Sequence, residues 1–104
     1  MAQYNFTGNA DLDLEPIVDD THQTWGALQT NKYIDGLEKI AQTLAENPDV
    51  GANRESISPG LRSLPYKSHI FYYLNIQQGV SIVRVLHSNM DSAHHLVKKK
   101  ELEI

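Results

Sequence analysis

The stretch SIVRVLHSNMD, residues 81–91, places two chemically capable side chains near the end of an apolar run. Arg84 carries a permanent positive charge, and His87 can exchange a proton near neutral pH. The pair forms either the centre of an active site or one wall of a groove that binds another protein. In a regular strand successive side chains alternate between the two faces, so positions 84 and 87 are predicted to lie on opposite faces. We therefore do not expect them to act on one phosphate.

Other histidines of the chain do not predict a metal site. His94 and His95 are adjacent, so on a helix their side chains diverge by roughly 100° and make a poor chelate. The sequence contains no cysteine, which excludes disulfides, thiolate zinc sites and a cysteine nucleophile. We expect neither a metal nor another cofactor.

Length and composition predict one compact domain spanning residues 1–104. The N-terminus lacks the pattern of a secretory signal, and no segment approaches the roughly 18 apolar residues of a membrane span. We therefore expect a cytoplasmic protein that does not interact with membranes. The formal charge of −4 argues against sequence-specific nucleic-acid binding. Residues 1–50 hold nine acids and two bases, whereas residues 51–104 hold four acids and seven bases, so an acidic partner is expected to meet the second half.

The pattern of apolar residues predicts the elements that position these groups. Residues 3–7 alternate as a short strand near a sheet edge. Two apolar stripes at three-to-four spacing, ending near Gly26 and near Asn47-Pro48, predict an antiparallel pair of helices. Pro16 conflicts with the first helix, which either starts near Asp13 or is kinked. Trp25 is predicted to anchor that helix in the core.

Three β-rich runs follow, LRSLPYK, SHIFYYLNI and VSIVRVLH, and the last two are separated by a hairpin signal. The final run is apolar on both faces and is predicted to be a central strand. The helices can cover only one face of such a sheet. The other face is expected to be covered by residues 92–104, the C-terminal tail, or by a different protein.

The order of these elements and several short motifs resemble the ParE toxins of the RelE/ParE superfamily. The motifs are Asp13-Leu14, Ile17, Trp25-Gly26, Tyr33, LAENPDVG, PGLRSLP, SHIFYYL and SIVRVLHSNMD, and the resemblance covers roughly residues 3–91. It implies an α+β fold of order β-α-α-β-β-β, in which a helical hairpin packs on one face of a twisted antiparallel sheet. It also implies a ParD-like antitoxin partner and inhibition of DNA gyrase rather than an enzymatic activity.

The superfamily also contains RelE-like toxins, which cleave messenger RNA on the ribosome. That reaction needs proton-transfer groups and positive charge on the phosphate. Arg62, Lys67 and Arg84 could supply the charge, and His87 or Tyr72 could transfer the proton. These are few basic groups for a surface that must hold RNA. We therefore favour protein binding, with ribonuclease activity as the alternative.

The candidate partner-binding residues follow from this choice. They are Arg62, Lys67, Tyr72, Arg84, Leu86, His87, Asn89, Met90 and Asp91. ParE-like chains usually place one or two basic residues after the Leu-His pair, where this chain has Ser88 and Asn89. A weakly toxic or inactive toxin that binds only its antitoxin is therefore a further alternative.

Overall fold

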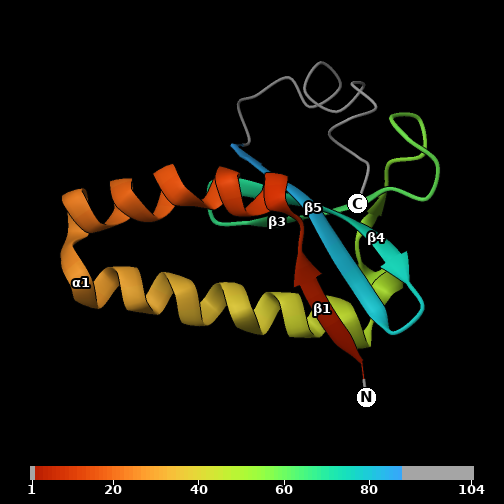
Figure 1. Ribbon diagram of the computed structural model, residues 1–104, viewed down its shortest axis with the longest axis horizontal. Helices are drawn as coiled ribbons and strands as arrows, with labels where there is room; N and C mark the ends of the chain where they lie inside the picture. Colours follow the sequence, from red (N-terminus) through yellow and green to blue (C-terminus); the bar gives the residue numbers. More distant parts are fainter. Residues whose placement is uncertain (1, 88–104) are drawn as a thin grey trace.

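The computed structural model describes residues 2–87 as one helical hairpin packed on a five-stranded sheet (Figure 1). The chain begins with strand β1 (Gln3–Phe6) and continues into helix α1 (Gly8–Glu46). A short 3-10 turn η1 (Pro48–Val50) follows, and then strands β2 (Ala52–Asn53), β3 (Arg62–Tyr66), β4 (His69–Ile76) and β5 (Gly79–His87). The strand order across the sheet is β1-β5-β4-β3-β2. The predicted order of elements and the α+β class are confirmed, with β2 as an additional short strand.

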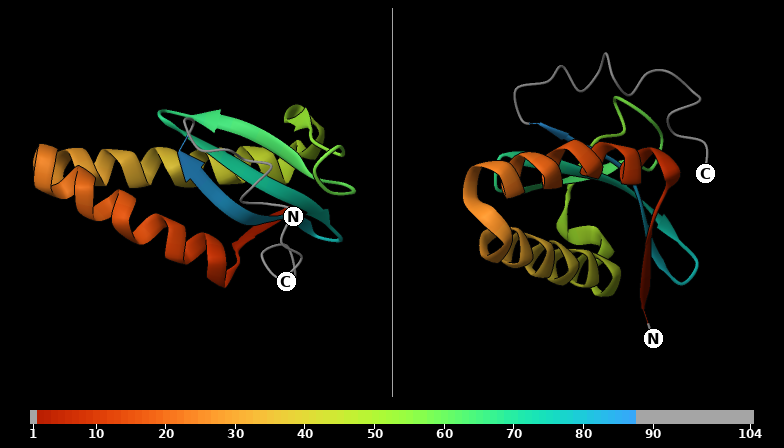
Figure 2. Two further views of the ribbon diagram at one scale, coloured as in Figure 1. Left: turned by 90° about the horizontal axis from the view of Figure 1, so that it is seen from above. Right: turned by 60° about the vertical axis from the view of Figure 1, so that its left-hand side comes forward.

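Gly26 divides α1 into two arms that fold back on each other. Its φ of 85° and ψ of 179° lie outside the helical region and in a region that essentially only glycine adopts. We call residues 8–25 the first arm and residues 27–46 the second arm. Figure 2 shows both arms on one side of the sheet, as predicted. The first arm begins at Gly8, so it does not start late near Asp13, and it contains Pro16. The backbone of α1 leaves the helical region at Gly26 and not at Pro16.

The sheet is mixed, which corrects the prediction of a wholly antiparallel sheet. Strands β2 to β5 pair antiparallel, but β1 runs parallel to β5. No tight turn joins β1 to β5, so nothing in the connection forces them to be antiparallel. At the end of β1, the Thr7 amide donates to the Ile82 carbonyl over 3.0 Å, and its hydroxyl donates to the Val83 carbonyl over 3.1 Å. Because β1 runs parallel to β5, the chain leaves β1 next to Ile82 and Val83 of β5 and begins the first arm there.

The larger core lies between the two arms and the sheet. Its buried residues include Leu37 and Leu44 from the second arm and Phe71, Tyr73 and Ile82 from the sheet. Trp25 does not join them, because it lies at the end of the hairpin that projects beyond the sheet (Figure 1), where its side chain is 71% exposed. The prediction that Trp25 anchors the core is therefore wrong.

A second, smaller core occupies the opposite face of the sheet. Leu61, Tyr72, Val83 and Leu86 are at most 2% exposed there, and Ile57 of the loop between β2 and β3 packs against them. This face was expected to be covered by the C-terminal tail or by a different protein, and Ile57 of the loop between β2 and β3 covers part of it instead. Strand β5 is buried on both faces, as predicted.

Candidate functional site

A groove between the first arm of α1 and the C-terminal end of β5 brings together several predicted site residues. We call it the α1–β5 groove; its volume is about 410 Å³. The first arm contributes Leu12, Asp13, Pro16, Ile17 and Asp20. The sheet contributes His69 from β4 and Arg84, Val85, Leu86 and His87 from β5. Figure 1 shows the first arm running across this end of β5.

Arg84 is held in place by Asp13. The Arg84 Nε donates to Asp13 Oδ2 over 2.7 Å, and a second guanidinium nitrogen donates to Asp13 Oδ1 over 3.0 Å. The two side chains are 12% and 15% exposed. Asp13 Oδ2 also accepts the backbone amide of Val85 over 2.9 Å. Strand β1 ends at Phe6 and does not extend alongside Val85. The Asp13 carboxylate therefore accepts the Val85 amide, which a longer neighbouring strand would otherwise accept.

A β-bulge alters the alternation of side chains along β5. Tyr72 pairs with Arg84 and Tyr73 with Ile82, so Val83 is an extra residue on β5. For this reason Ile82 and Val85, three positions apart, both belong to the core beneath the helices. Arg84 and His87 both line the α1–β5 groove. Beyond the bulge the alternation is regular, because Val85 faces the core beneath the helices and Leu86 the opposite core, so Arg84 and His87 start from opposite faces and still both border the groove at the strand end.

His87 and His69 form an aromatic pair in the wall of the groove. Their rings pack edge to face with centroids 5.4 Å apart, and the Tyr33 ring packs against His69 at 6.4 Å. His69 Nδ1 is buried and has no hydrogen-bond partner. Burial, and secondarily the neighbouring His87, lower the pKa of His69 below its usual value of 6.5. Its surroundings thus favour a neutral imidazole at His69.

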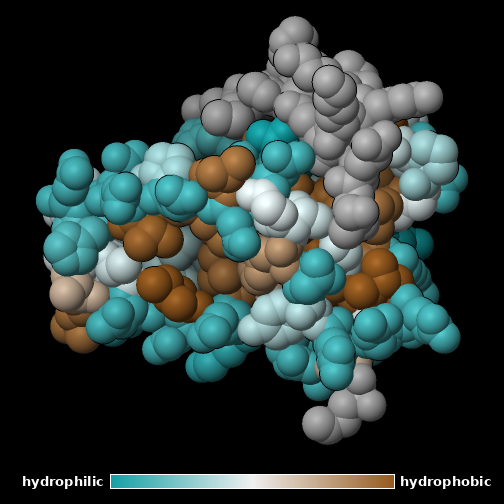
Figure 3. All heavy atoms as spheres, in the orientation of Figure 1, coloured by the Kyte–Doolittle hydropathy of each residue, from teal (hydrophilic) through white to brown (hydrophobic). Residues whose placement is uncertain are grey.

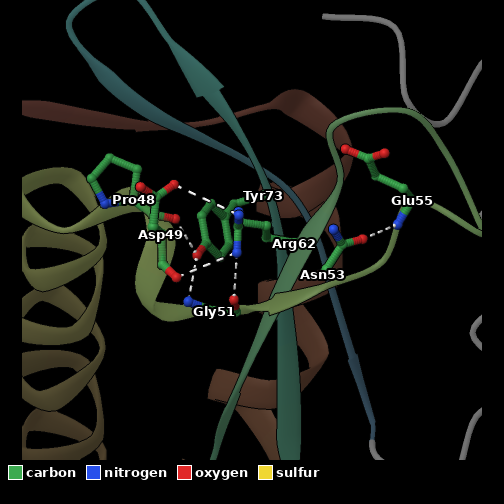
Figure 4. A network of polar contacts seen from close by, with 7 residues as sticks. All are labelled: Pro48, Asp49, Gly51, Asn53, Glu55, Arg62 and Tyr73. Carbon is green, nitrogen blue, oxygen red and sulfur yellow. Dashed lines mark hydrogen bonds and ion pairs between the residues drawn. The ribbon is translucent and has the colours of Figure 1, made fainter.

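Arg62 lies in a separate polar network at the other end of β3 (Figure 4). Its guanidinium donates to the Gly51 carbonyl over 2.8 Å and lies 3.7 Å from the Asp49 carboxylate. Tyr73 completes the network, because its hydroxyl donates to the Pro48 carbonyl over 2.7 Å and accepts the Gly51 amide over 2.9 Å. These contacts fasten the end of the second arm to the sheet.

The remaining candidates are not gathered at the groove. Lys67 is exposed in the turn between β3 and β4, and its ammonium lies 5.9 Å from the centre of the Tyr66 ring. Tyr72 and Leu86 are each 2% exposed and belong to the second core, although Leu86 also borders the groove. Asn89, Met90 and Asp91 lie outside the described residues, as does the C-terminal tail. Within residues 2–87, no cluster of three metal-ligating side chains occurs.

The sequence patterns did not predict a binding role for the α1 residues that line the groove. Leu12 is 63% exposed there, and the apolar residues of the first arm were interpreted as core alone. The signal was present in the spacing, because positions 13, 16, 17 and 20 fall on one face of a helix. Within the described residues, no helix is both long enough and apolar enough to cross a lipid bilayer.

Comparisons with known proteins agree with this architecture. A family model described as the ParE toxin of the type II toxin-antitoxin system, parDE, matches residues 4–92. A protein named Toxin ParE1 from Mycobacterium tuberculosis (strain CDC 1551 / Oshkosh) is 34% identical over 96 residues, which cover 91% of this chain and 98% of the relative. Toxin ParE1 from Caulobacter vibrioides is 32% identical over 96 residues, covering 92% and 99%.

A solved structure also shares the fold. A chain from the chromosomal ParDE TA system from P. aeruginosa superposes with a TM-score of 0.67 at 22% sequence identity, covering 84% of this chain and 96% of that chain. The family match spans most of the sequence, and the two relatives align over nearly their whole length. This protein therefore belongs to the ParE toxin family of type II toxin–antitoxin systems.

Proposed function

We propose that this ParE-family chain acts by binding proteins rather than by catalysis. A ParD-like antitoxin neutralises it in the cytoplasm, and the released toxin inhibits DNA gyrase. The observation that carries the proposal is the match to the ParE toxin family over residues 4–92. The solved structure with the same fold comes from a ParDE system, which supports a ParD-like partner.

The groove geometry supports binding over ribonuclease chemistry. A catalytic arginine must reach a phosphate as charge develops on it. The guanidinium of Arg84 instead makes a bidentate contact with Asp13, and that of Arg62 is directed to Gly51 and Asp49. The Tyr72 side chain is buried, so its hydroxyl is poorly placed to exchange a proton with a substrate.

Inducible expression in a sensitive bacterial host tests the proposal. The protein encoded by the neighbouring reading frame is co-expressed in a parallel culture as the candidate antitoxin. We expect growth arrest without this partner and normal growth with it, while messenger RNA on translating ribosomes stays intact. Cleaved messenger would instead establish the RelE-like activity. Unimpaired growth together with tight partner binding would identify an inactive toxin that retains only its antitoxin.

A further inference from the structure

The end of the helical hairpin that points away from the sheet exposes large apolar side chains. Trp25 is 71% exposed and Leu28 is 72% exposed, on either side of the turn at Gly26. We call residues 21–31, which surround this turn, the hairpin tip. Figure 3 shows hydrophobic side chains at the surface at this outer end of the hairpin. Large apolar groups that gather on an exposed surface indicate a place where another molecule binds.

The hairpin tip carries no formal charge when its histidine is neutral. Residues 21–31 contain no aspartate, glutamate, lysine or arginine, although Asp20 and Lys32 lie directly on either side. The centres of protein interfaces are depleted of charged residues, and tryptophan is enriched among the side chains that contribute most to binding. DNA is a poor match for this surface, because its phosphates are neutralised by lysine and arginine. The composition therefore favours a protein with an apolar, uncharged cleft.

The backbone of the hairpin tip is fixed in its turned shape. Gly26 adopts a φ of 85°, which favours glycine, and its carbonyl accepts the Thr30 hydroxyl over 2.9 Å. Thr30 is buried. On the first arm, the Thr21 hydroxyl donates to the Ile17 carbonyl over 2.8 Å. A surface that is already ordered loses less conformational entropy when it binds, so the tip is suited to insertion into a partner.

The size of the hairpin tip determines which kind of partner fits it. An aromatic side chain buries about 150–250 Å², so two copies that met through Trp25 and Leu28 would fall short of the roughly 1,000 Å² of a stable interface. A concave partner can instead enclose the tip and contact its sides as well. The hairpin extends beyond the sheet (Figure 2), which leaves its end open to such a partner. Clefts of this kind occur preferentially between domains, which favours a large, multi-domain protein.

We propose that the hairpin tip is the surface that contacts DNA gyrase. Trp25 inserts into an apolar, uncharged cleft of the enzyme, and Leu28 packs at the rim of that cleft. Gyrase is the large, multi-domain partner in the proposed function. The inference rests on that function and adds to it the part of the chain that reaches the target. Because the tip supplies no charge, this contact should depend only weakly on salt.

The chain contains a single tryptophan, which makes the contact directly measurable. The full chain is produced with 5-hydroxytryptophan in place of Trp25, because this analogue can be excited selectively in the presence of the tryptophans of gyrase. Quenching by acrylamide is measured for the chain alone, with gyrase, with plasmid DNA alone and with the protein encoded by the neighbouring reading frame. We expect gyrase to lower the quenching constant about threefold or more, because side chains at the centre of an interface are shielded from solvent. Plasmid DNA alone should leave it unchanged.

Substitutions at the tip test the same contact independently. Trp25→Ala and Leu28→Ser should each raise Kd for immobilised gyrase about tenfold or more. Val50→Ser removes an exposed apolar side chain beyond the opposite end of the second arm and should leave Kd within about twofold. All variants are first checked for an unchanged thermal unfolding midpoint. For the original chain, Kd should be similar at about 0.05 M and about 0.5 M salt, where screening differs strongly.

The outcomes separate the contact surface from the proposed function. If gyrase leaves the quenching unchanged while the same sample inhibits supercoiling, the tip is not the contact and the proposed function stands. A chain that neither binds nor inhibits gyrase overturns both. Protection of Trp25 by plasmid DNA or by the neighbouring-frame protein, and not by gyrase, assigns the tip to that partner and overturns the inference. Equal effects of Leu28→Ser and Val50→Ser on Kd would also contradict it.

Discussion

At the scale of single residues, Asp13 links the first arm of α1 to β5. Its carboxylate accepts two bonds from the Arg84 guanidinium and one from the Val85 amide, and 71 residues separate Asp13 from Arg84 along the chain. Both side chains are mostly buried. Removing one partner of a buried ion pair leaves the other charge uncompensated, which costs far more than losing an exposed pair.

Asp13→Ala should therefore destabilise the fold by about 3 kcal/mol. The free energy of unfolding is measured by urea titration followed by circular dichroism. Asp19→Ala removes an exposed acid from the same arm and is expected to change stability by less than about 0.5 kcal/mol. Equal, small effects of the two substitutions would contradict the role assigned to Asp13.

His69 makes stability depend on pH in the mildly acidic range. Its pKa is lowered in the folded state by burial and by His87, so the unfolded chain binds a proton more readily. Stability is therefore fully present above the unfolded value near 6.5 and is lost as pH falls from there toward the folded pKa.

His69→Gln should flatten this part of the stability profile. Urea unfolding of both proteins is compared at intervals between about pH 7.5 and 5, the range in which histidine titrates. The original chain should lose more stability than the variant on acidification. A variant with an undiminished pH dependence would show that His69 is not the responsible group.

At the scale of elements, the second arm and β3 meet where a glycine makes room for a tyrosine. The Tyr66 hydroxyl donates to the Tyr33 carbonyl over 3.2 Å, and a Cβ at Gly36 would overlap that hydroxyl. The two tyrosine rings lie 5.3 Å apart. Gly36 therefore serves helix-to-sheet packing, although glycine inside a helix costs about 1 kcal/mol relative to alanine.

Gly36→Ala should lower the free energy of unfolding by about 1 to 3 kcal/mol, because the overlap outweighs the gain in helix propensity. The same substitution in a Tyr66→Phe background removes the overlapping hydroxyl and should be less costly. The two costs are compared by urea titration in a double-mutant cycle. If Gly36→Ala stabilised both backgrounds equally, close packing at this position would be excluded.

Prediction from sequence succeeded for elements with a local signal. Gly26 interrupts the helical period, and the aromatic and β-branched residues of 69–76 and 79–87 identify the two long strands. It failed where the decisive contact is distant in sequence. Trp25 fits the apolar stripe of the first arm, but periodicity does not reveal that the hairpin extends past the sheet. The parallel direction of β1 depends on contacts between Thr7 and β5, far along the chain.

The candidate site was predicted only in part for the same reason. Arg84, Leu86 and His87 were predicted as partner-binding residues at one strand end; all three line the groove, and their binding role stays a prediction. The opposite wall of the groove is formed by the first arm. That arm contains several acids, and the sequence does not show that Asp13 is the one that pairs with Arg84. The bulge at Val83 likewise leaves no reliable local signal, since it depends on register with β4.

At the scale of the whole molecule, burial determines which surfaces of residues 2–87 are open to a partner. The sheet is buried on both faces around β5, whereas the α1–β5 groove and the end of the projecting hairpin, with Trp25 and Leu28, are accessible. A fold alone does not determine a function. The function proposed for this molecule therefore depends on family membership together with arginines that are engaged in internal contacts.

Inhibition of gyrase supercoiling by the purified chain tests this account most directly. Relaxed plasmid and ATP are incubated with gyrase at two enzyme concentrations while the toxin is titrated. Because a tight binding inhibitor acts stoichiometrically, the toxin concentration for half inhibition should rise in proportion to the gyrase concentration, and pre-incubation with the antitoxin should abolish the effect. Unchanged supercoiling at large toxin excess would contradict the account.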